Sequence, residues 1–276
     1  MVVGDITNPF YPEVIDKLTK RLSLQKLNVM LVNVLEGARA EDALAPLFQY
    51  RVKAAIFVAL SLTSRACDLC RRNDVPIILF NRYIDDPRVL KIVCDNVNAG
   101  RLIAKTLSDA GHRKLVYIAG STDTSTNRDR KVGFTEMLLE RGDCECVLEN
   151  AGAYSYEAGH QAGLRLVREN RSMDAIFCAN DIVAMGVMDA LRYGGGVRIP
   201  EDVSVVGFDD IAAARWPAYD LTTVRQPVDR MIEMMAAKLE SYSRSRCLIE
   251  NDNLMRVPGQ FIARSSAKLS QVQTKD

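Results

Sequence analysis

Short, almost continuously apolar runs alternate along the chain with segments in which apolar residues recur every three or four positions. The apolar runs lie at residues 54–60, 75–80, 114–120, 144–149, 174–179 and 203–208, and the helix-like segments at residues 41–51, 64–73, 98–112, 130–142, 155–170 and 181–195. Apolar strands that alternate with amphipathic helices are typical of βαβ units, in which helices cover both faces of a parallel sheet. The pattern therefore predicts an α/β fold with parallel sheets.

The alternation closes near Asn98 and then begins again with a second set of strands and helices of similar length. A chain of 276 residues also exceeds the usual size of one hydrophobic core. We therefore expect two doubly wound lobes of comparable size.

The composition is that of an ordinary globular protein, with 48% hydrophobic and 26% charged residues. The 36 Lys and Arg residues balance the 35 Asp and Glu residues, so the overall charge indicates neither nucleic acid nor a membrane surface as a partner of this chain. The apolar runs are shorter than the ~20 residues of a membrane helix, and no export signal is visible at the start. We therefore expect a cytoplasmic protein that makes no membrane contact.

The seven cysteines are odd in number and lie mostly in or beside apolar runs, which suits reduced thiols in a cytosolic protein. Cys67 and Cys70 have the C-x-x-C spacing of a redox pair or of half a metal site. No second pair follows at the spacing of a zinc site, and both residues fall on a helical pattern. The pair is therefore interpreted as structural, and no metal or cofactor is expected.

Polar clusters stand at the ends of the predicted strands in both halves of the chain. They contain Asp5 and Asn8, Ser61, Asn81 and Arg82, Asp95 and Asn96, Ser121 and Asp123, Asn180 and Asp181, and Asp209 and Asp210. In an open parallel sheet the carboxyl ends of the strands share one edge, which is where ligands bind. These side chains offer donors and acceptors for a small, hydroxyl-rich molecule, and Phe10, Tyr154 and Trp216 offer apolar ring faces. The alternative for each cluster is helix capping, which favours the same residue types.

The chain lacks the groups that hydrolytic catalysis needs. It has only His112 and His160, no G-x-S-x-G nucleophile elbow and no phosphate loop of the G-x-x-x-x-G-K-[ST] type. Asp209 and Asp210 are adjacent, so at the end of a strand their side chains point in opposite directions. Binding without turnover is therefore expected, and the protein is not expected to be an enzyme.

Several blocks together resemble the effector-binding region of the LacI/GalR family of bacterial transcription repressors. The blocks are DITNPFY, VCDNVNAGRLIAKTLSDAGHRKLVYIAG, NRDRKVGF, CANDIVAMGVMDAL, IPEDVSVVGFDDI, LTTVRQPVDRM and VPGQFIARSS, and they span residues 4–266 in the family's order. The resemblance implies two periplasmic-binding-protein-like lobes joined by three crossovers, with a small-molecule effector between them. It implies a first lobe of residues 1–96 plus 227–250, a second of residues 97–226 plus 251–268, and a disordered tail at residues 269–276.

The resemblance also carries most of the candidate contacts to the effector. Asn8 and Phe10 match the family's contact positions in the first loop, and Asn81 matches the position after the third strand. Arg130, Tyr154, Asn180, Asp209 and Gln226 match further contact positions, and Ser61 joins them because it ends an apolar run. We expect Asn180 to reach the ligand and Asp181 to cap the helix that follows.

The function implied is that of a sensor domain in a repressor. In this family a helix-turn-helix domain, absent from this chain, binds operator DNA, and a homodimer presents two such domains to a palindromic site. Arg130, Asp209 and the carboxamides favour a neutral sugar as the effector, whereas Arg82 leaves a sugar acid or phosphate open. A solute-binding protein of a sugar transporter is the alternative function, followed by an enzyme on the same scaffold.

Overall fold

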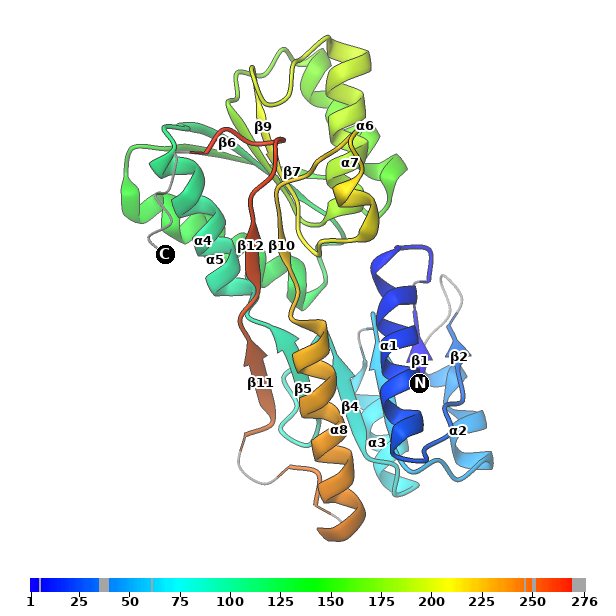
Figure 1. The fold of residues 1–276 in the computed structure, drawn as a ribbon. Coiled ribbons are helices and arrows are strands. Elements are labelled where there is room, and N and C mark those ends of the chain that lie inside the picture. The colour runs from blue at the N-terminus through cyan, green and yellow to red at the C-terminus, as the bar shows by residue number, and fades with distance from the viewer. Residues whose placement is uncertain (5, 35–39, 61, 246, 250–251, 270–276) are drawn as a thin grey trace. The chain divides into compact units, whose positions relative to one another are not determined.

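The computed structural model describes residues 1–4, 6–34, 40–60, 62–245, 247–249 and 252–269, which fall into two compact units (Figure 1). Unit 1 consists of Met1–Cys94 and Pro227–Val257, and unit 2 of Asp95–Gln226 and Pro258–Asp276. The chain passes from one unit to the other after Cys94, Gln226 and Val257, which are the three crossovers expected. The predicted tail lies outside the described residues, except for residue 269.

Unit 1 is built on a parallel sheet with the strand order β11-β5-β4-β3-β1-β2. Its strands are β1 (Val2–Val3), β2 (Val32–Asn33), β3 (Ala55–Val58), β4 (Ile77–Phe80), β5 (Leu90–Cys94) and β11 (Leu254–Val257). Every residue of β3, β4 and β5 is buried, as the continuous apolar runs predicted for strands covered on both faces. The helices of unit 1 are α1 (Phe10–Leu24), α2 (Ala45–Gln49), α3 (Ser64–Arg72) and α8 (Val228–Ser245), with a short 3₁₀ turn, η1, at Ala40–Ala43.

Strand β11 lies in a different unit from the one that the sequence analysis gave it. Leu254–Val257 pairs in parallel with Lys91–Cys94 of β5, so this segment extends the sheet of unit 1. The family resemblance implied that residues 251–268 all belong to the second lobe. The crossover instead follows Val257, because the backbone groups of β11 are satisfied by β5.

Unit 2 has a parallel sheet with the strand order β7-β6-β8-β9. Its strands are β6 (Lys114–Ala119), β7 (Glu145–Asn150), β8 (Ala175–Cys178) and β9 (Ser204–Val206), and its helices are α4 (Asn96–Asp109), α5 (Ser125–Arg141), α6 (Tyr156–Arg168) and α7 (Asp181–Asp189). A π-helical turn, η2 (Ala190–Gly194), continues α7, and a 3₁₀ turn, η3 (Ala212–Arg215), follows β9. The two parallel sheets confirm the predicted α/β fold class.

A separate antiparallel pair in unit 2 joins β10 (Thr223–Arg225) to β12 (Gln260–Ile262). Bridges from Val206 to Thr222 and from Asp209 to Arg225 tie β10 to the segment that begins with β9. The residues that follow β9 are therefore held by backbone bonds on one side.

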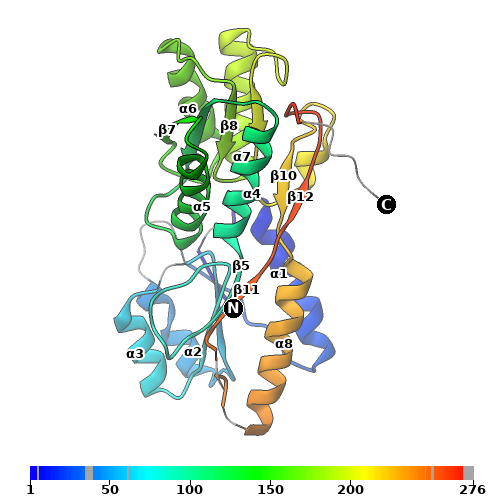
Figure 2. The ribbon, with the colours of Figure 1, turned by 90° about the vertical axis from the view of Figure 1, so that its left-hand side faces the viewer.

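Helices α4 and α5 lie side by side and approach each other closely (Figure 2). A Cβ atom on Gly133 of α5 would come 1.9 Å from the carbonyl oxygen of Val97, and one on Gly100 of α4 would come 2.4 Å from that of Arg130. Only glycine fits at these two positions, because the backbones themselves are in contact. This contact fixes the position of α5 along α4, and therefore also the position of Arg130.

No helix in the described part of the chain is long and apolar enough to cross a membrane. The described residues also contain no group of three or more His, Cys, Asp or Glu side chains that could hold a metal ion.

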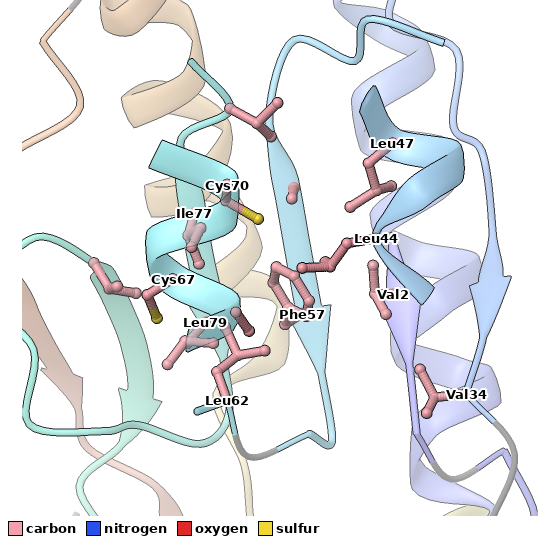
Figure 3. Packing of buried hydrophobic residues seen from close by; sticks show 14 residues of the cluster. Val2, Val34, Leu44, Leu47, Phe57, Leu62, Cys67, Cys70, Ile77 and Leu79 are labelled. Carbon is pink, nitrogen blue, oxygen red and sulfur yellow. The ribbon is translucent and has the colours of Figure 1, made fainter. Parts of the chain in front are cut away.

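The C-x-x-C pair lies on α3 and faces the core of unit 1, where Cys67 and Cys70 pack among Phe57, Ile77 and Leu79 (Figure 3). Both thiols are free and buried. Burial raises the pKa of the Cys67 thiol to about 11 and that of Cys70 to about 12. These surroundings agree with the structural interpretation, because a reactive thiol needs access and a lowered pKa.

We expect Cys67 and Cys70 to resist alkylation in the folded protein, whereas the exposed Cys247 reacts rapidly. Iodoacetamide labelling at about pH 8, read by mass spectrometry with and without denaturant, measures this difference. Rapid modification of the native pair, or a Cys67–Cys70 disulfide after mild oxidation, would instead favour a redox role.

Candidate ligand-binding site

The guanidinium of Arg130 is a deeply buried charge, with 2% of the residue exposed. Its Nε donates to Asn96 Oδ1 at 2.9 Å and its Nη1 donates to the carbonyl oxygen of Ala179 at 2.5 Å. The guanidinium carbon lies 3.5 Å from the centre of the Phe208 ring, in a cation–π contact. The side chain is thereby held between α4, the end of β8 and the segment after β9.

Asp209 follows β9 and supplies the counter-charge. Its Oδ1 lies 3.6 Å from Arg130 Nη2 and accepts a hydrogen bond of 2.7 Å from Gln226 Nε2. Burial raises the pKa of Asp209 to about 6, although Arg130 and Gln226 both act to lower it. The carboxylate is thus a charged group whose environment only partly compensates its lost hydration.

The backbone at Asp209 has a φ of +124°, in a region that residues with a side chain rarely adopt. A strained backbone conformation persists only where the surrounding structure stabilises it, and such conformations are concentrated at functional sites. Here the β-bridge between Asp209 and Arg225 stabilises the conformation of Asp209. The strained backbone therefore supports a functional position for this carboxylate.

Gln226 lies one residue beyond β10 and has 3% of its surface exposed. Its amide nitrogen donates a hydrogen bond to Asp209, while its Oε1 is buried and has no hydrogen-bond partner among the described residues. A buried acceptor without a partner costs about 1–3 kcal/mol, so it favours a ligand that brings a donor. Arg130, Asp209 and Gln226 are therefore three predicted site residues that the fold brings together.

The order of roles predicted for Asn180 and Asp181 is wrong in one respect. Asn180, not Asp181, is the N-cap of α7, and its Oδ1 accepts from the backbone N–H of Val183 at 3.1 Å. Asp181 occupies the first position of the helix. The mistake arises because Asn and Asp are equally good caps, so residue type alone cannot decide which one takes the position.

Asp181 instead accepts hydrogen bonds from two separate segments, which contain Ile211 and Thr223. Its fully buried carboxylate accepts from Thr223 Oγ1 at 2.6 Å and from the backbone N–H of Ile211 at 2.9 Å. Gly207 leaves room for it, since a Cβ there would come 2.2 Å from Asp181 Oδ1. Burial, and then the charge of Asp209, raise the pKa of Asp181 to about 7.

Tyr154 lies with its ring against Gly120, where a Cβ would come 2.5 Å from the ring. Its hydroxyl is 2.8 Å from Thr124 Oγ1 and 3.3 Å from Thr126 Oγ1. Trp216, the other ring considered in this half of the chain, has 58% of its surface exposed. The role of Tyr154 as a ligand contact stays a prediction.

The candidates in unit 1 are Asn8, Phe10 and Asn81, while Ser61 lies outside the described residues. Asn8 Oδ1 accepts from the backbone N–H of Phe10 at 3.1 Å, and the Phe10 ring packs edge-on against Tyr11. Asn81 has a φ of +76°, and its buried Oδ1 has no hydrogen-bond partner among the described residues. Asn81 thus combines backbone strain with an open acceptor, as Asp209 and Gln226 do together in unit 2.

The contacts that hold Arg130 in place could not be predicted from the sequence. Asn96 stands in one of the polar clusters and Phe208 in one of the apolar runs, but their contacts with Arg130 join residues far apart in the chain. No local pattern reports such contacts.

One arrangement in unit 2 has the composition of a catalytic triad. Ser204 Oγ lies 3.2 Å from His112 Nε2, and His112 Nδ1 lies 3.7 Å from Asp174 Oδ1. His112 Nε2 is also 3.0 Å from the carbonyl oxygen of Lys268, which can only accept, so this nitrogen carries a proton and cannot take one from Ser204. Ser204 is moreover fully buried, so this group is structural.

The protein has two α/β units, each with a parallel sheet, and the chain crosses between them three times. Polar side chains follow the strand ends in both units. These features are typical of the class of two-domain ligand-binding proteins. The family described as periplasmic binding proteins and sugar binding domain of LacI family matches residues 1–238, and the chain belongs to this family. The resemblance seen in the sequence is thereby confirmed.

The chain is 28% identical over 260 residues to the HTH-type transcriptional repressor PurR of Photobacterium profundum, covering 91% of this chain and 77% of that protein. Among solved structures, a LacI transcriptional regulator from a Rhodococcus species has a TM-score of 0.85 and 25% identity, with 98% of each chain covered. The regulator CelR in complex with cellobiose has a TM-score of 0.83 and 25% identity, covering 96% of this chain and 83% of that one.

The raised pKa of Asp181 makes its contribution to stability depend on pH. A folded-state pKa of about 7, against about 4 in the unfolded chain, means that the folded state holds a proton the unfolded state has released. The stabilising contribution is therefore present below about pH 4 and is lost as the pH rises to about 7. Replacing Asp181 with Asn keeps the shape and removes the titration.

We expect wild type to lose unfolding free energy relative to Asp181→Asn between about pH 5 and pH 7, with a slope of at most about 1.4 kcal/mol per pH unit. Denaturant unfolding across this range measures the difference. Asp202→Asn is the matched control, because Arg198 lowers the pKa of Asp202 to about 2, so it does not titrate in this window. A difference that does not vary with pH would contradict the assignment.

Proposed function

We propose that this chain is the effector-binding domain of a LacI-type transcriptional repressor and that its effector is a small, hydroxyl-rich molecule. The observation that carries the proposal is the buried group formed by Arg130, Asp209 and Gln226, in which Gln226 Oε1 lacks a partner among the described residues. The family match and the PurR relative support the regulatory role.

Arg130, Asp209 and Gln226 have distinct proposed roles. A ligand hydroxyl donates to Asp209 or to Gln226 Oε1 and accepts from Arg130, whose Nη groups have N–H donors beyond the one bound to Ala179. Because Arg130 and Asp209 cancel each other's charge, the group suits a neutral sugar, and the cellobiose complex of CelR supports this class of ligand. Further proposed contacts are Asn8, Phe10, Ser61, Asn81, Tyr154 and Asn180.

The proposal extends to partners that this chain does not contain. Effector binding shifts the affinity of a helix-turn-helix domain for operator DNA, because a ligand that binds one conformation more tightly shifts the population toward it. A cytoplasmic homodimer would present two such domains. PurR is named as a transcriptional repressor, which favours this function over a transporter's solute-binding protein and over an enzyme.

A thermal-shift screen of this chain tests the proposal. The panel contains neutral sugars, sugar acids, sugar phosphates, nucleosides and purines. An effector at ~100 times its dissociation constant adds about 2.7 kcal/mol to the unfolding free energy and raises the melting temperature by several degrees. Products are then analysed after long incubation, since chemical turnover of a binding compound would favour an enzyme.

Replacement of Asp209 with Asn should weaken effector binding by about 1–3 kcal/mol, because a carboxylate that accepts from a ligand hydroxyl becomes an amide and Arg130 loses its counter-charge. Isothermal titration calorimetry with the effector from the screen measures the loss. Asp202→Asn, a surface change in the same unit, should bind like wild type. Equal affinity of the Asp209 variant and wild type would exclude Asp209 from the site.

A further inference from the structure

Next to the candidate effector residues, three arginines converge on a single buried carboxylate. Asp210 Oδ1 accepts from Arg264 Nη2 at 2.6 Å, and Asp210 Oδ2 accepts from Arg225 Nε at 2.6 Å and from Arg215 Nη2 at 3.2 Å. The Asp210 side chain is completely buried. We call Asp210, Arg215, Arg225 and Arg264 the arginine cluster.

The arginine cluster carries more positive than negative charge. Three guanidinium groups face one carboxylate, and in the described part of the chain no second carboxylate lies within ion-pair distance of any of the three. Burial acts to raise the pKa of Asp210, yet the hydrogen bonds from Arg264 and Arg225 lower it below its ordinary value. The positive surroundings therefore outweigh the loss of hydration.

The arginines come from separate segments, so their convergence is a property of the tertiary fold. Arg215 ends η3, Arg225 ends β10 and Arg264 follows β12. Arg264 is also anchored by its Nη1, which donates to the carbonyl oxygen of Leu221 at 2.6 Å. Arg264 and Arg225 already donate hydrogen bonds to both oxygens of Asp210. Arg215 therefore brings a third positive charge to a carboxylate whose two oxygens already have arginine partners.

Arg215 and Arg225 expose the surplus charge to solvent. Their side chains are 60% and 45% exposed, whereas that of Arg264 is 11% exposed. Both contact the same oxygen of Asp210, so their guanidinium groups are close neighbours. Each guanidinium has five N–H donors, and the contacts with Asp210 use few of them. The remaining donors of two neighbouring guanidinium groups can hydrogen-bond to the oxygens of a tetrahedral anion.

We propose that the arginine cluster is an oxyanion-binding site, separate from the effector residues, that takes a phosphate group through Arg215 and Arg225 while Asp210 and Arg264 hold the two in place. The phosphate group is either free inorganic phosphate or the phosphoryl group of a small ester. A bound dianion cancels the two surplus charges. This site does not depend on the proposed effector function, because its residues are not among the proposed effector contacts.

The test is calorimetric titration of the chain with inorganic phosphate at about pH 8 and constant ionic strength, so that general screening does not change. Wild type should show saturable binding with one site, and phosphate should raise its melting temperature. The double variant Arg215→Gln/Arg225→Gln should bind at least ~tenfold more weakly, since both solvent-facing forks are lost while Arg264 still pairs with Asp210.

A second double variant controls for net charge. Arg168→Gln/Arg198→Gln also removes two arginines from the surface of unit 2, but neither of them belongs to the cluster, and it should bind phosphate as wild type does. Asp209→Asn should likewise keep phosphate binding, which separates this site from the effector residues. Loss of binding in either control, no saturable binding by wild type, or equal binding by the cluster variant would overturn the proposal.

Methyl phosphate in the same titration distinguishes the two sources of the anion. If the site takes the phosphoryl group of an ester, methyl phosphate binds as tightly as inorganic phosphate and depends equally on Arg215 and Arg225. If only free phosphate fits, the ester binds at least ~tenfold more weakly while the dependence of phosphate binding on the two arginines remains.

Discussion

The buried guanidinium of Arg130 is the constraint on which the arrangement of unit 2 depends. A charge removed from water costs several kcal/mol unless its donors are bound and a counter-charge is near. Asn96, the carbonyl oxygen of Ala179, the Phe208 ring and Asp209 meet these needs from α4, from the end of β8 and from the segment after β9. These segments must therefore keep fixed positions relative to α5, which carries Arg130. The close contacts at Gly100 and Gly133 hold α4 and α5 in those positions.

A second buried ionisable group, the carboxyl of Asp181, helps to hold the candidate site together. It holds Ile211 and Thr223, which flank Asp209 and Gln226 in the chain, and so limits the movement of both. Burial raises the pKa values of Asp181 and Asp209, and the charge of Asp209 adds to the shift at Asp181, whereas Arg130 acts to lower the pKa of Asp209. The electrostatic strain is thus concentrated where the candidate ligand contacts lie.

The α/β class and the two-unit organisation could be predicted from the sequence, because strand and helix periodicities are local properties. The gathering of Arg130, Asp209 and Gln226 also followed from the sequence, through family motifs. The placement of β11 did not, since pairing with β5 is a contact between distant segments. The cap of α7 was assigned to Asp181 instead of Asn180 for a different reason: Asn and Asp are equally good caps, and only the geometry of the helix start separates them.

Asp209 and Asp210 are adjacent in the chain, yet their side chains lie in different chemical environments. The side chain of Asp209 meets a single arginine, at 3.6 Å, and a glutamine whose oxygen stays open, so the surroundings select a neutral ligand that brings hydrogen-bond donors. An anionic group there would meet the Asp209 carboxylate. The side chain of Asp210 meets three arginines, so its surroundings attract the anions that Asp209 repels. Asp209 contacts Arg130 and Gln226, whereas Asp210 contacts Arg215, Arg225 and Arg264, so the two carboxylates share none of these partners although their residues are neighbours.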